Sequence, residues 1–183
     1  MGRIVLVTGG CRSGKSGYAQ RRIEEVDGAR LFIATAEPYD DEMRHRIARH
    51  RADRADRGWD TLDAPYALAE SITKGEGYAG VLVDCLTLWV GNRFFGGVSG
   101  ELPTDATEEK AREEAERLQA AARRLPPSSL VVFVTNEVGW GIVPENAMAR
   151  RFRDLAGHVN QTVAAGADEV FLLVCGQPLK LKG

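Results

Sequence analysis

The segment from Gly9 to Ser16 is the part of this sequence whose chemistry is easiest to identify. It runs Gly9-Gly10-Cys11-Arg12-Ser13-Gly14-Lys15-Ser16, the pattern G-x-x-x-x-G-K-S. In such a loop, backbone N–H groups and the start of the following helix point at phosphate oxygens. Lys15 can then reach the β- and γ-phosphates, and Ser16 can ligate Mg²⁺. A strand pattern precedes the loop and a helix pattern follows it, so we predict a nucleoside triphosphate site rather than a chance glycine-rich turn.

Asp84 is the second candidate ligand for Mg²⁺. It ends the apolar run Val81-Leu82-Val83, and P-loop enzymes place a magnesium-binding carboxylate at the end of such a strand. An aspartate that caps a helix would look the same, because a helix is predicted to follow. We favour the magnesium role because the sequence also contains the phosphate loop.

A histidine in the predicted helix 40–51 is a candidate nucleophile. Met43, Ile47 and His50 share one helix face, and His45 points elsewhere. The flanking arginines are Arg44, Arg46, Arg49, Arg51 and Arg54. A neutral imidazole could attack phosphorus, and the guanidinium groups would lower its pKa and stabilise the added negative charge. From the residues alone, a half-buried structural histidine is the alternative.

Trp59 and Asp63 are candidates for recognising a purine base. An aspartate can accept hydrogen bonds from the N1 and N2 groups of guanine, and an aromatic ring can stack on the base. A packed tryptophan and a surface aspartate explain the same two residues equally well.

Short apolar runs alternate with longer helical patterns along the chain. The predicted strands are 4–8, 31–34, 81–84, 130–135 and 169–174, and the predicted helices are 15–26, 40–51, 65–73, 86–95, 107–125 and 144–165. This order predicts an α/β fold of the P-loop NTPase type, a doubly wound, mostly parallel sheet with helices on both faces. We expect a mobile loop at 96–104, and Pro126-Pro127 should end the helix before the fourth strand.

Composition excludes several other classes of protein. The 183 residues fit a single domain spanning 1–183, and the net charge of −2 gives no reason to expect nucleic-acid binding. No stretch approaches the roughly 20 apolar residues of a membrane helix, so we expect no stable membrane insertion. The three cysteines, Cys11, Cys85 and Cys175, form no C-x-x-C pair. Reduced thiols and a cytoplasmic location are therefore expected.

Residues 135–146 follow the fourth predicted strand and should lie at the carboxyl edge of the sheet, where ligands bind in open α/β folds. Their glycines and polar groups suit contact with a ligand such as a phosphate. The alternative is a tight loop leading into a helix that Pro144 begins.

Several segments occur together and in the order of a known family. They are 9–16, 40–43, His50, 84–87, 135–146, 151–157 and 159–161. On these segments the chain resembles the bifunctional adenosylcobinamide kinase and adenosylcobinamide-phosphate guanylyltransferase family, from about Ile4 to Lys182. The phosphate loop is shared by many families, whereas T-N-E-V-G-x-G-I-V-P-E-N at 135–146 is far more specific.

The resemblance implies two reactions. The kinase reaction uses ATP or GTP, with Mg²⁺, to phosphorylate adenosylcobinamide. The guanylyltransferase reaction moves GMP from GTP onto a histidine, which falls on His50 here, and then onto adenosylcobinamide phosphate. The product is adenosylcobinamide-GDP. The resemblance also implies a homotrimer.

The family's nucleotide contacts carry over onto positions of this sequence. They fall on the phosphate loop and on Thr35, Ala36, Glu37, Arg51, Ala52, Asp53, Arg54, Asp63 and Asp84. Family members often have Glu in place of Asp63 and Arg-Pro in place of Arg54-Ala55, and this chain has one extra residue before Trp59. The carboxylate of Asp63 is one methylene shorter than that of Glu, which would shift the geometry of a contact with the base.

Two other functions fit the phosphate loop. A monofunctional P-loop kinase of another small molecule would use Lys15, Ser16 and Asp84 but leave His50 unlabelled by GTP. A non-catalytic GTP-binding module would bind nucleotide without corrinoid-dependent turnover. The histidine helix and the 135–146 segment favour the bifunctional enzyme.

Overall fold

The computed structural model describes residues 1–97 and 106–183, together with every side chain in these ranges except that of Arg46. Most of the loop predicted at 96–104 therefore lies outside the described residues.

A seven-stranded sheet of order β3-β2-β4-β5-β1-β6-β7 forms the centre of the molecule. Its strands are β1 (Arg3–Gly9), β2 (Arg30–Ala34), β3 (Trp59–Asp63), β4 (Gly80–Asp84), β5 (Leu130–Val134), β6 (Glu169–Val174) and β7 (Gln177–Lys182). All neighbouring strands are parallel except β6 and β7. The predicted fold class is confirmed.

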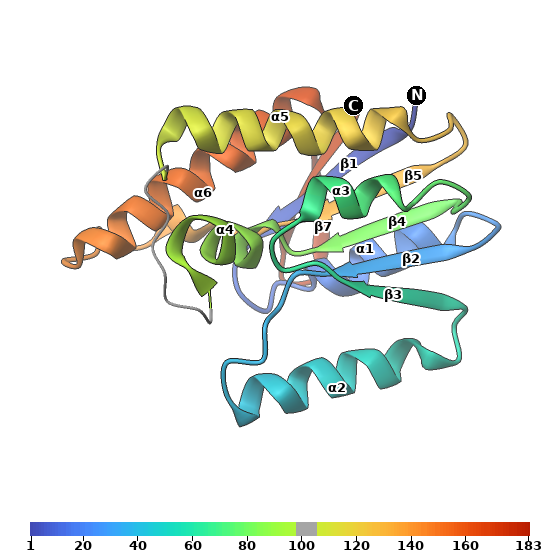
Figure 1. Ribbon diagram of the computed structural model, residues 1–183, viewed down its shortest axis with the longest axis horizontal. Coiled ribbons are helices and arrows are strands. Elements are labelled where there is room, and N and C mark those ends of the chain that lie inside the picture. Colours follow the sequence, from blue (N-terminus) through green and yellow to red (C-terminus); the bar gives the residue numbers. More distant parts are fainter. Residues whose placement is uncertain (98–105) are drawn as a thin grey trace.

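Helices cover both faces of this sheet (Figure 1). They are α1 (Lys15–Glu24), α2 (Asp41–Ala55), α3 (Leu68–Thr73), α4 (Leu86–Phe95), α5 (Glu108–Arg124), the short 3₁₀ helix η2 (Val138–Trp140) and α6 (Ala147–Gly166). Alternate β1 residues face opposite ways. Ile4 and Leu6 pack with α3, α4, α5 and α6, whereas Val5 and Val7 pack with α1.

Two edge strands, β3 and β7, were not predicted. The side chains of β3 are half-buried or exposed, and those of β7 are all exposed. Edge strands bury little, so their sequences, WDTLD and QPLKLK, lack the continuous apolar run that identifies an interior strand. The five interior strands are buried, and all five were predicted.

Capping side chains explain where two helices begin. Asp40 accepts a hydrogen bond from the backbone N of Met43 at 2.7 Å and starts α2, which continues to Ala55, beyond the predicted end. Asn146 accepts one from Ala149 at 3.0 Å, so α6 begins at Ala147. The prediction that Pro144 begins this helix is therefore wrong.

Smaller shifts occur at two other helices. The helix predicted at 65–73 begins only at Leu68, and α1 ends at Glu24 rather than at residue 26. Helix α5 ends at Arg124, just before the two prolines, as predicted.

Candidate active site

The phosphate loop lies between β1 and α1 and is supported by the turn that joins β6 to β7. The backbone N of Gly176 donates to the Ser13 carbonyl at 2.9 Å. A Cβ on Gly14 would lie 3.1 Å from the Cα of Gly176, and one on Gly9 would lie 2.5 Å from the Leu173 carbonyl oxygen. Both glycines have positive φ, 95° and 149°. Only glycine permits this close packing of the loop on the hairpin.

Lys15 is buried inside the loop. Its Nζ donates to the Gly10 carbonyl at 2.6 Å and approaches the Ser13 hydroxyl at 3.4 Å. Burial lowers the pKa of Lys15, and the nearby charges of Asp84 and Glu137 oppose that shift. The ammonium group therefore lies where the oxygens of a bound triphosphate would supply its missing countercharge. The exposed Cys11 and Arg12 form the outer part of the loop.

Asp84 lies at the carboxyl end of β4, one strand beyond β5. The residue that caps α4 is Cys85, which makes no side-chain capping bond, so the capping interpretation of Asp84 does not hold. The Asp84 carboxylate and the Ser16 hydroxyl are hard oxygen ligands of the kind that Mg²⁺ prefers. The described residues contain no group of three or more His, Cys, Asp or Glu side chains that could hold a metal. A magnesium ion here would therefore also need phosphate and water ligands, as is usual for nucleotide sites.

The predicted histidine face of α2 is confirmed. Met43, Ile47 and His50 are all half-buried, while His45 is exposed. Arg54, one turn after His50, lies on the same face and is only 3 % exposed. The guanidinium carbon of Arg54 lies 3.5 Å from the centroid of the Phe32 ring.

The arginines of α2 that flank His50 differ in environment. Arg44, Arg49 and Arg51 are exposed, as are Ala52 and Asp53, whereas Arg54 is buried. Burial lowers the pKa of Arg54, and the charge of Asp84 opposes this. The Nε and Nη1 atoms of Arg54 are buried without a hydrogen-bond partner among the described residues. These donors remain available to an anion.

The hypothesis that Trp59 and Asp63 jointly contact one base is wrong. They occupy opposite ends of β3, roughly 13 Å apart at 3.3 Å per residue. Trp59 packs edge-on against Phe32, with ring centroids 6.2 Å apart, and its indole N–H donates to Glu24 at 3.0 Å. Asp63 lies at the carboxyl end of the strand and accepts from Arg51 at 2.5 Å.

The segment after β2 joins the carboxyl edge of the sheet to α2. The backbone N of Thr35 donates to the Asp84 carbonyl at 3.2 Å, and its hydroxyl donates to the Cys85 carbonyl at 2.7 Å. Ala36 follows, and the Glu37 carboxylate accepts from the Tyr66 hydroxyl at 3.0 Å. Thr35 and Asp84 therefore lie next to each other at the carboxyl edge of the sheet.

Sequence reasoning did not single out a polar network at the end of β5. The Thr135 hydroxyl donates to Asn160 Oδ1 at 2.7 Å, and Asn160 Nδ2 donates to the Asn136 carbonyl at 3.1 Å. Thr8 donates to Glu137 Oε1 at 2.5 Å. The sequence does contain a pattern that indicates such a network, because the polar residues Thr135-Asn136-Glu137 come directly after a buried strand.

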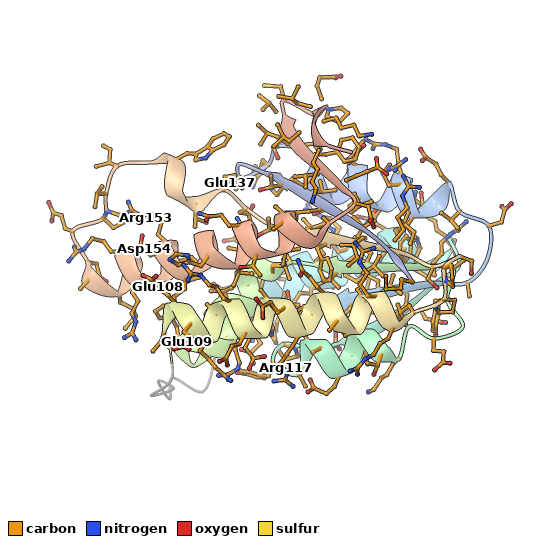
Figure 2. The ribbon with its side chains drawn as sticks, turned by 90° about the horizontal axis from the view of Figure 1, so that it is seen from above. Glu108, Glu109, Arg117, Glu137, Arg153 and Asp154 are labelled. Carbon is orange, nitrogen blue, oxygen red and sulfur yellow. The ribbon has the colours of Figure 1, made fainter. Side chains whose placement is uncertain are left out.

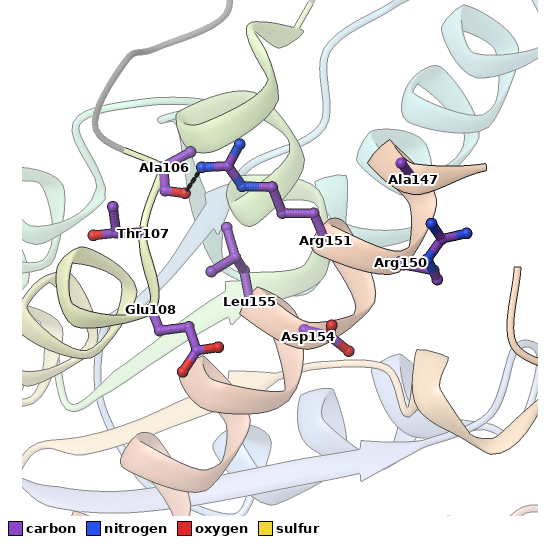
Figure 3. Close-up of a pocket in the computed structure, with 8 residues that line it drawn as sticks. All are labelled: Ala106, Thr107, Glu108, Ala147, Arg150, Arg151, Asp154 and Leu155. Carbon is purple, nitrogen blue, oxygen red and sulfur yellow. Dashed lines mark hydrogen bonds between the residues drawn. The ribbon is translucent and has the colours of Figure 1, made fainter. Parts of the chain in front are cut away.

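A separate cavity of about 400 Å³ lies between the start of α5 and the first turns of α6 (Figure 3). Glu108, Arg150, Arg151 and Asp154 line it, and Arg151 donates to the Ala106 carbonyl. None of the site residues predicted from the sequence is among its lining residues.

A glycine-rich loop between a parallel strand and a helix, with a carboxylate at the end of a nearby strand, defines a P-loop nucleotide-binding protein. The sequence model of the family described as "Cobinamide kinase / cobinamide phosphate guanyltransferase" matches residues 5–181. The chain belongs to this family.

Three curated relatives are similar over nearly their whole length. "Bifunctional adenosylcobalamin biosynthesis protein CobU" of Escherichia coli is 43 % identical over 98 % of this chain and 99 % of the relative. The protein of the same name in Salmonella typhimurium is 44 % identical over the same shares. "Bifunctional adenosylcobalamin biosynthesis protein CobP" of Pseudomonas aeruginosa is 40 % identical over 97 % and 96 %.

The RadB recombinase crystal structure has a similar fold, with a TM-score of 0.52 over 93 % of this chain and 73 % of that chain. At 14 % identity, this likeness shows the fold alone. Among the described residues, no helix is long and apolar enough to span a membrane.

Proposed function

We propose that this chain phosphorylates adenosylcobinamide with ATP or GTP and then transfers GMP from GTP, through a guanylyl-histidine, to adenosylcobinamide phosphate. The product is adenosylcobinamide-GDP, an intermediate of cobalamin biosynthesis. The observation that carries this proposal is membership of the cobinamide kinase and guanyltransferase family over residues 5–181.

In the kinase reaction, the phosphate loop holds the triphosphate. Lys15 neutralises charge on the β- and γ-phosphates from its buried position, and the loop N–H groups orient them. Ser16 and Asp84 would hold Mg²⁺, which neutralises phosphate charge when bound. The acceptor hydroxyl forms a bond to the γ-phosphorus, and the bond from that phosphorus to the bridging oxygen breaks.

In the guanylyl transfer, His50 is the nucleophile. Its imidazole nitrogen bonds to the α-phosphorus of GTP while the bond to the bridging oxygen breaks, and pyrophosphate leaves. The unpartnered N–H groups of Arg54 suit the negative charge that develops. A phosphate oxygen of the acceptor then attacks the same phosphorus, and the P–N bond breaks. Residues Thr35, Ala36, Glu37, Arg51, Ala52, Asp53 and Asp63 are proposed as further nucleotide contacts.

The proposal includes a homotrimer in the cytoplasm. Exposed apolar side chains after β5, Trp140 at 67 %, Ile142 at 97 % and Val143 at 59 %, are the kind of surface that subunit contacts cover. All three cysteines are free thiols, as expected of a reducing compartment.

Covalent labelling tests the proposal at His50. The protein is incubated with Mg²⁺ and α-³²P-GTP, denatured and counted, with His50→Ala and the matched control His45→Ala beside the wild type. His45 is exposed on another face of the same helix. We expect acid-labile, alkali-stable label in the wild type and in His45→Ala, and none in His50→Ala.

A folded wild type that binds GTP but takes up no label would contradict the transferase half. Corrinoid-dependent consumption of ATP or GTP would then indicate a simple P-loop kinase, and its absence would indicate a GTP-binding module.

A further inference from the structure

Glu137 lies against the wall of the phosphate loop. It follows β5, the strand between β1 and β4. Its backbone N donates to the Gly9 carbonyl at 3.2 Å, and its Oε1 accepts from the Thr8 hydroxyl at 2.5 Å. The carboxylate is therefore fixed to the last residues of the strand that carries the loop.

The second carboxylate oxygen of Glu137 is uncommitted. Oε1 also lies 3.5 Å from the Asn160 amide nitrogen, but Oε2 makes no hydrogen bond or ion pair to any residue in the described part of the chain. The side chain is half-buried, and its charge acts on Lys15. An oxygen with a free lone pair thus lies at the end of β5, next to the strand that carries the phosphate loop.

The other carboxylates at this edge of the sheet are engaged or lie farther away. Glu37 accepts from Tyr66, and Asp63 is paired with Arg51. Asp84 is aligned with Val134 of β5, so it lies one strand farther from the loop than Glu137 does. Glu137 is therefore the carboxylate that is bonded directly to the strand carrying the loop, through Gly9 and Thr8.

Phosphorylation of an alcohol requires a group that accepts the hydroxyl proton. Lys15 is a cation, and the loop itself contains no carboxylate or imidazole. We propose that Glu137 is the general base of the kinase reaction, a role that rests on the function proposed above. As the acceptor oxygen bonds to the γ-phosphorus, the O–H bond breaks and its proton passes to Glu137. The nucleoside diphosphate leaves, and the proton later passes to water.

The polar network after β5 fixes the base in place. Asn160 bonds both to the Asn136 carbonyl and to Thr135, so α6 holds the backbone immediately before Glu137. Thr8 holds the carboxylate from the other side. A base held on both sides loses little entropy when the acceptor arrives, which favours proton transfer.

Glu137→Gln tests the assignment, because the amide oxygen can still accept from Thr8 but the side chain cannot take up a proton. We expect the kinase kcat to fall about 100-fold or more, within the ~10²–10⁴ range of general-base catalysis, with the nucleotide KM changed less than about threefold. Labelling of His50 by GTP should change far less, because attack by a neutral imidazole requires no deprotonated alcohol.

Two controls separate chemistry from folding. Glu109→Gln removes a carboxylate on α5, away from Glu137 in Figure 2, and should leave the kinase kcat unchanged. Glu137→Asp keeps a carboxylate, so we expect it to lose kcat at acid pH as the wild type should. Glu137→Gln should lack this acid limb, because glutamine does not titrate.

The outcomes are distinguishable. A Glu137→Gln protein with kinase kcat within about threefold of the wild type and the same acid limb overturns the role of Glu137 and leaves the proposed function intact. A folded wild type that phosphorylates no corrinoid alcohol overturns the kinase function and the base assignment with it. A matching loss of kinase activity and of nucleotide binding in Glu137→Gln would make Glu137 a structural residue of the loop, against the proposal.

Discussion

The three cysteines illustrate how position alone sets the chemistry of one residue type. Cys85 is buried at the end of β4, and burial raises the pKa of its thiol to about 12. Cys11 in the phosphate loop and Cys175 in the β6–β7 turn are exposed. Because the thiolate is the nucleophile, Cys85 is a packing residue and the other two can react.

Alkylation at pH 8 should therefore modify Cys11 and Cys175 in the folded protein but leave Cys85 unmodified. Denaturant should expose all three thiols. Mass spectrometry after iodoacetamide treatment measures this, and bound GTP should slow the reaction of Cys11 by covering the loop. Equal labelling of Cys85 in the folded and unfolded chains would contradict the burial argument.

Residues whose role depends on local backbone were predictable from the sequence, and residues whose role depends on distant contacts were not. The phosphate loop is a local motif, so Lys15 and Ser16 could be identified from spacing. The burial of Arg54 against Phe32 joins α2 to β2 across the fold, and no spacing predicts it. The separation of Trp59 from Asp63 followed from a strand that was not foreseen.

At the scale of elements, α1 packs on β4 through a close contact. A Cβ on Gly80 would lie 2.5 Å from Cγ2 of Ile23, which is fully buried. A side chain at position 80 thus requires the buried Ile23, or α1 itself, to shift. Strand β4 could be predicted because both of its faces are covered, which gives it a continuous apolar sequence. Strands β3 and β7 lie at the edges of the sheet and have no such apolar run, so they could not be predicted.

Gly80→Ala should lower the free energy of unfolding by about 1–3 kcal/mol, the usual cost of overpacking a core. Urea denaturation measures the change. Gly157→Ala in α6 is the matched control, because its added Cβ would meet nothing within 4 Å. Alanine is the better helix former, so this variant should be neutral or more stable. Equal destabilisation by both variants would rule out the steric explanation.

At the scale of the whole molecule, Asp168 joins three elements. Its carboxylate accepts from the backbone N of Ile4 in β1 at 2.7 Å and from Arg123 of α5 at 2.7 and 3.0 Å. The hydrogen bond from Arg123 is the main cause that lowers the pKa of Asp168. The ionised side chain of Asp168, just before β6, therefore links the beginning of β1 to α5 through hydrogen bonds.

Asp168→Ala should destabilise the fold by about 1–2 kcal/mol near neutral pH, a value reduced for the partial exposure of the carboxylate. Since the folded pKa is the lower one, this contribution is fully present above the unfolded pKa of ~3.9. It is lost as the pH falls through the folded value. Thermal unfolding at pH 7 and pH 3 measures the difference, with the exposed Asp27→Ala as control. A destabilisation that grows as pH falls would contradict this sign.

The position of β1 has a consequence for how the protein is made. This strand lies between β5 and β6, and its loop is supported by the Gly176 turn, so a ribosome makes its partners more than a hundred residues later. Translation proceeds at ~5–20 residues per second. The apolar strand β1 and the glycine-rich loop therefore remain without their folded contacts for several seconds. We expect the nascent chain to bind nucleotide weakly during that interval, and its unpaired β-strand could pair with other chains. Chaperone demand should therefore be greatest at the start of synthesis, and nucleotide can help folding only at its end.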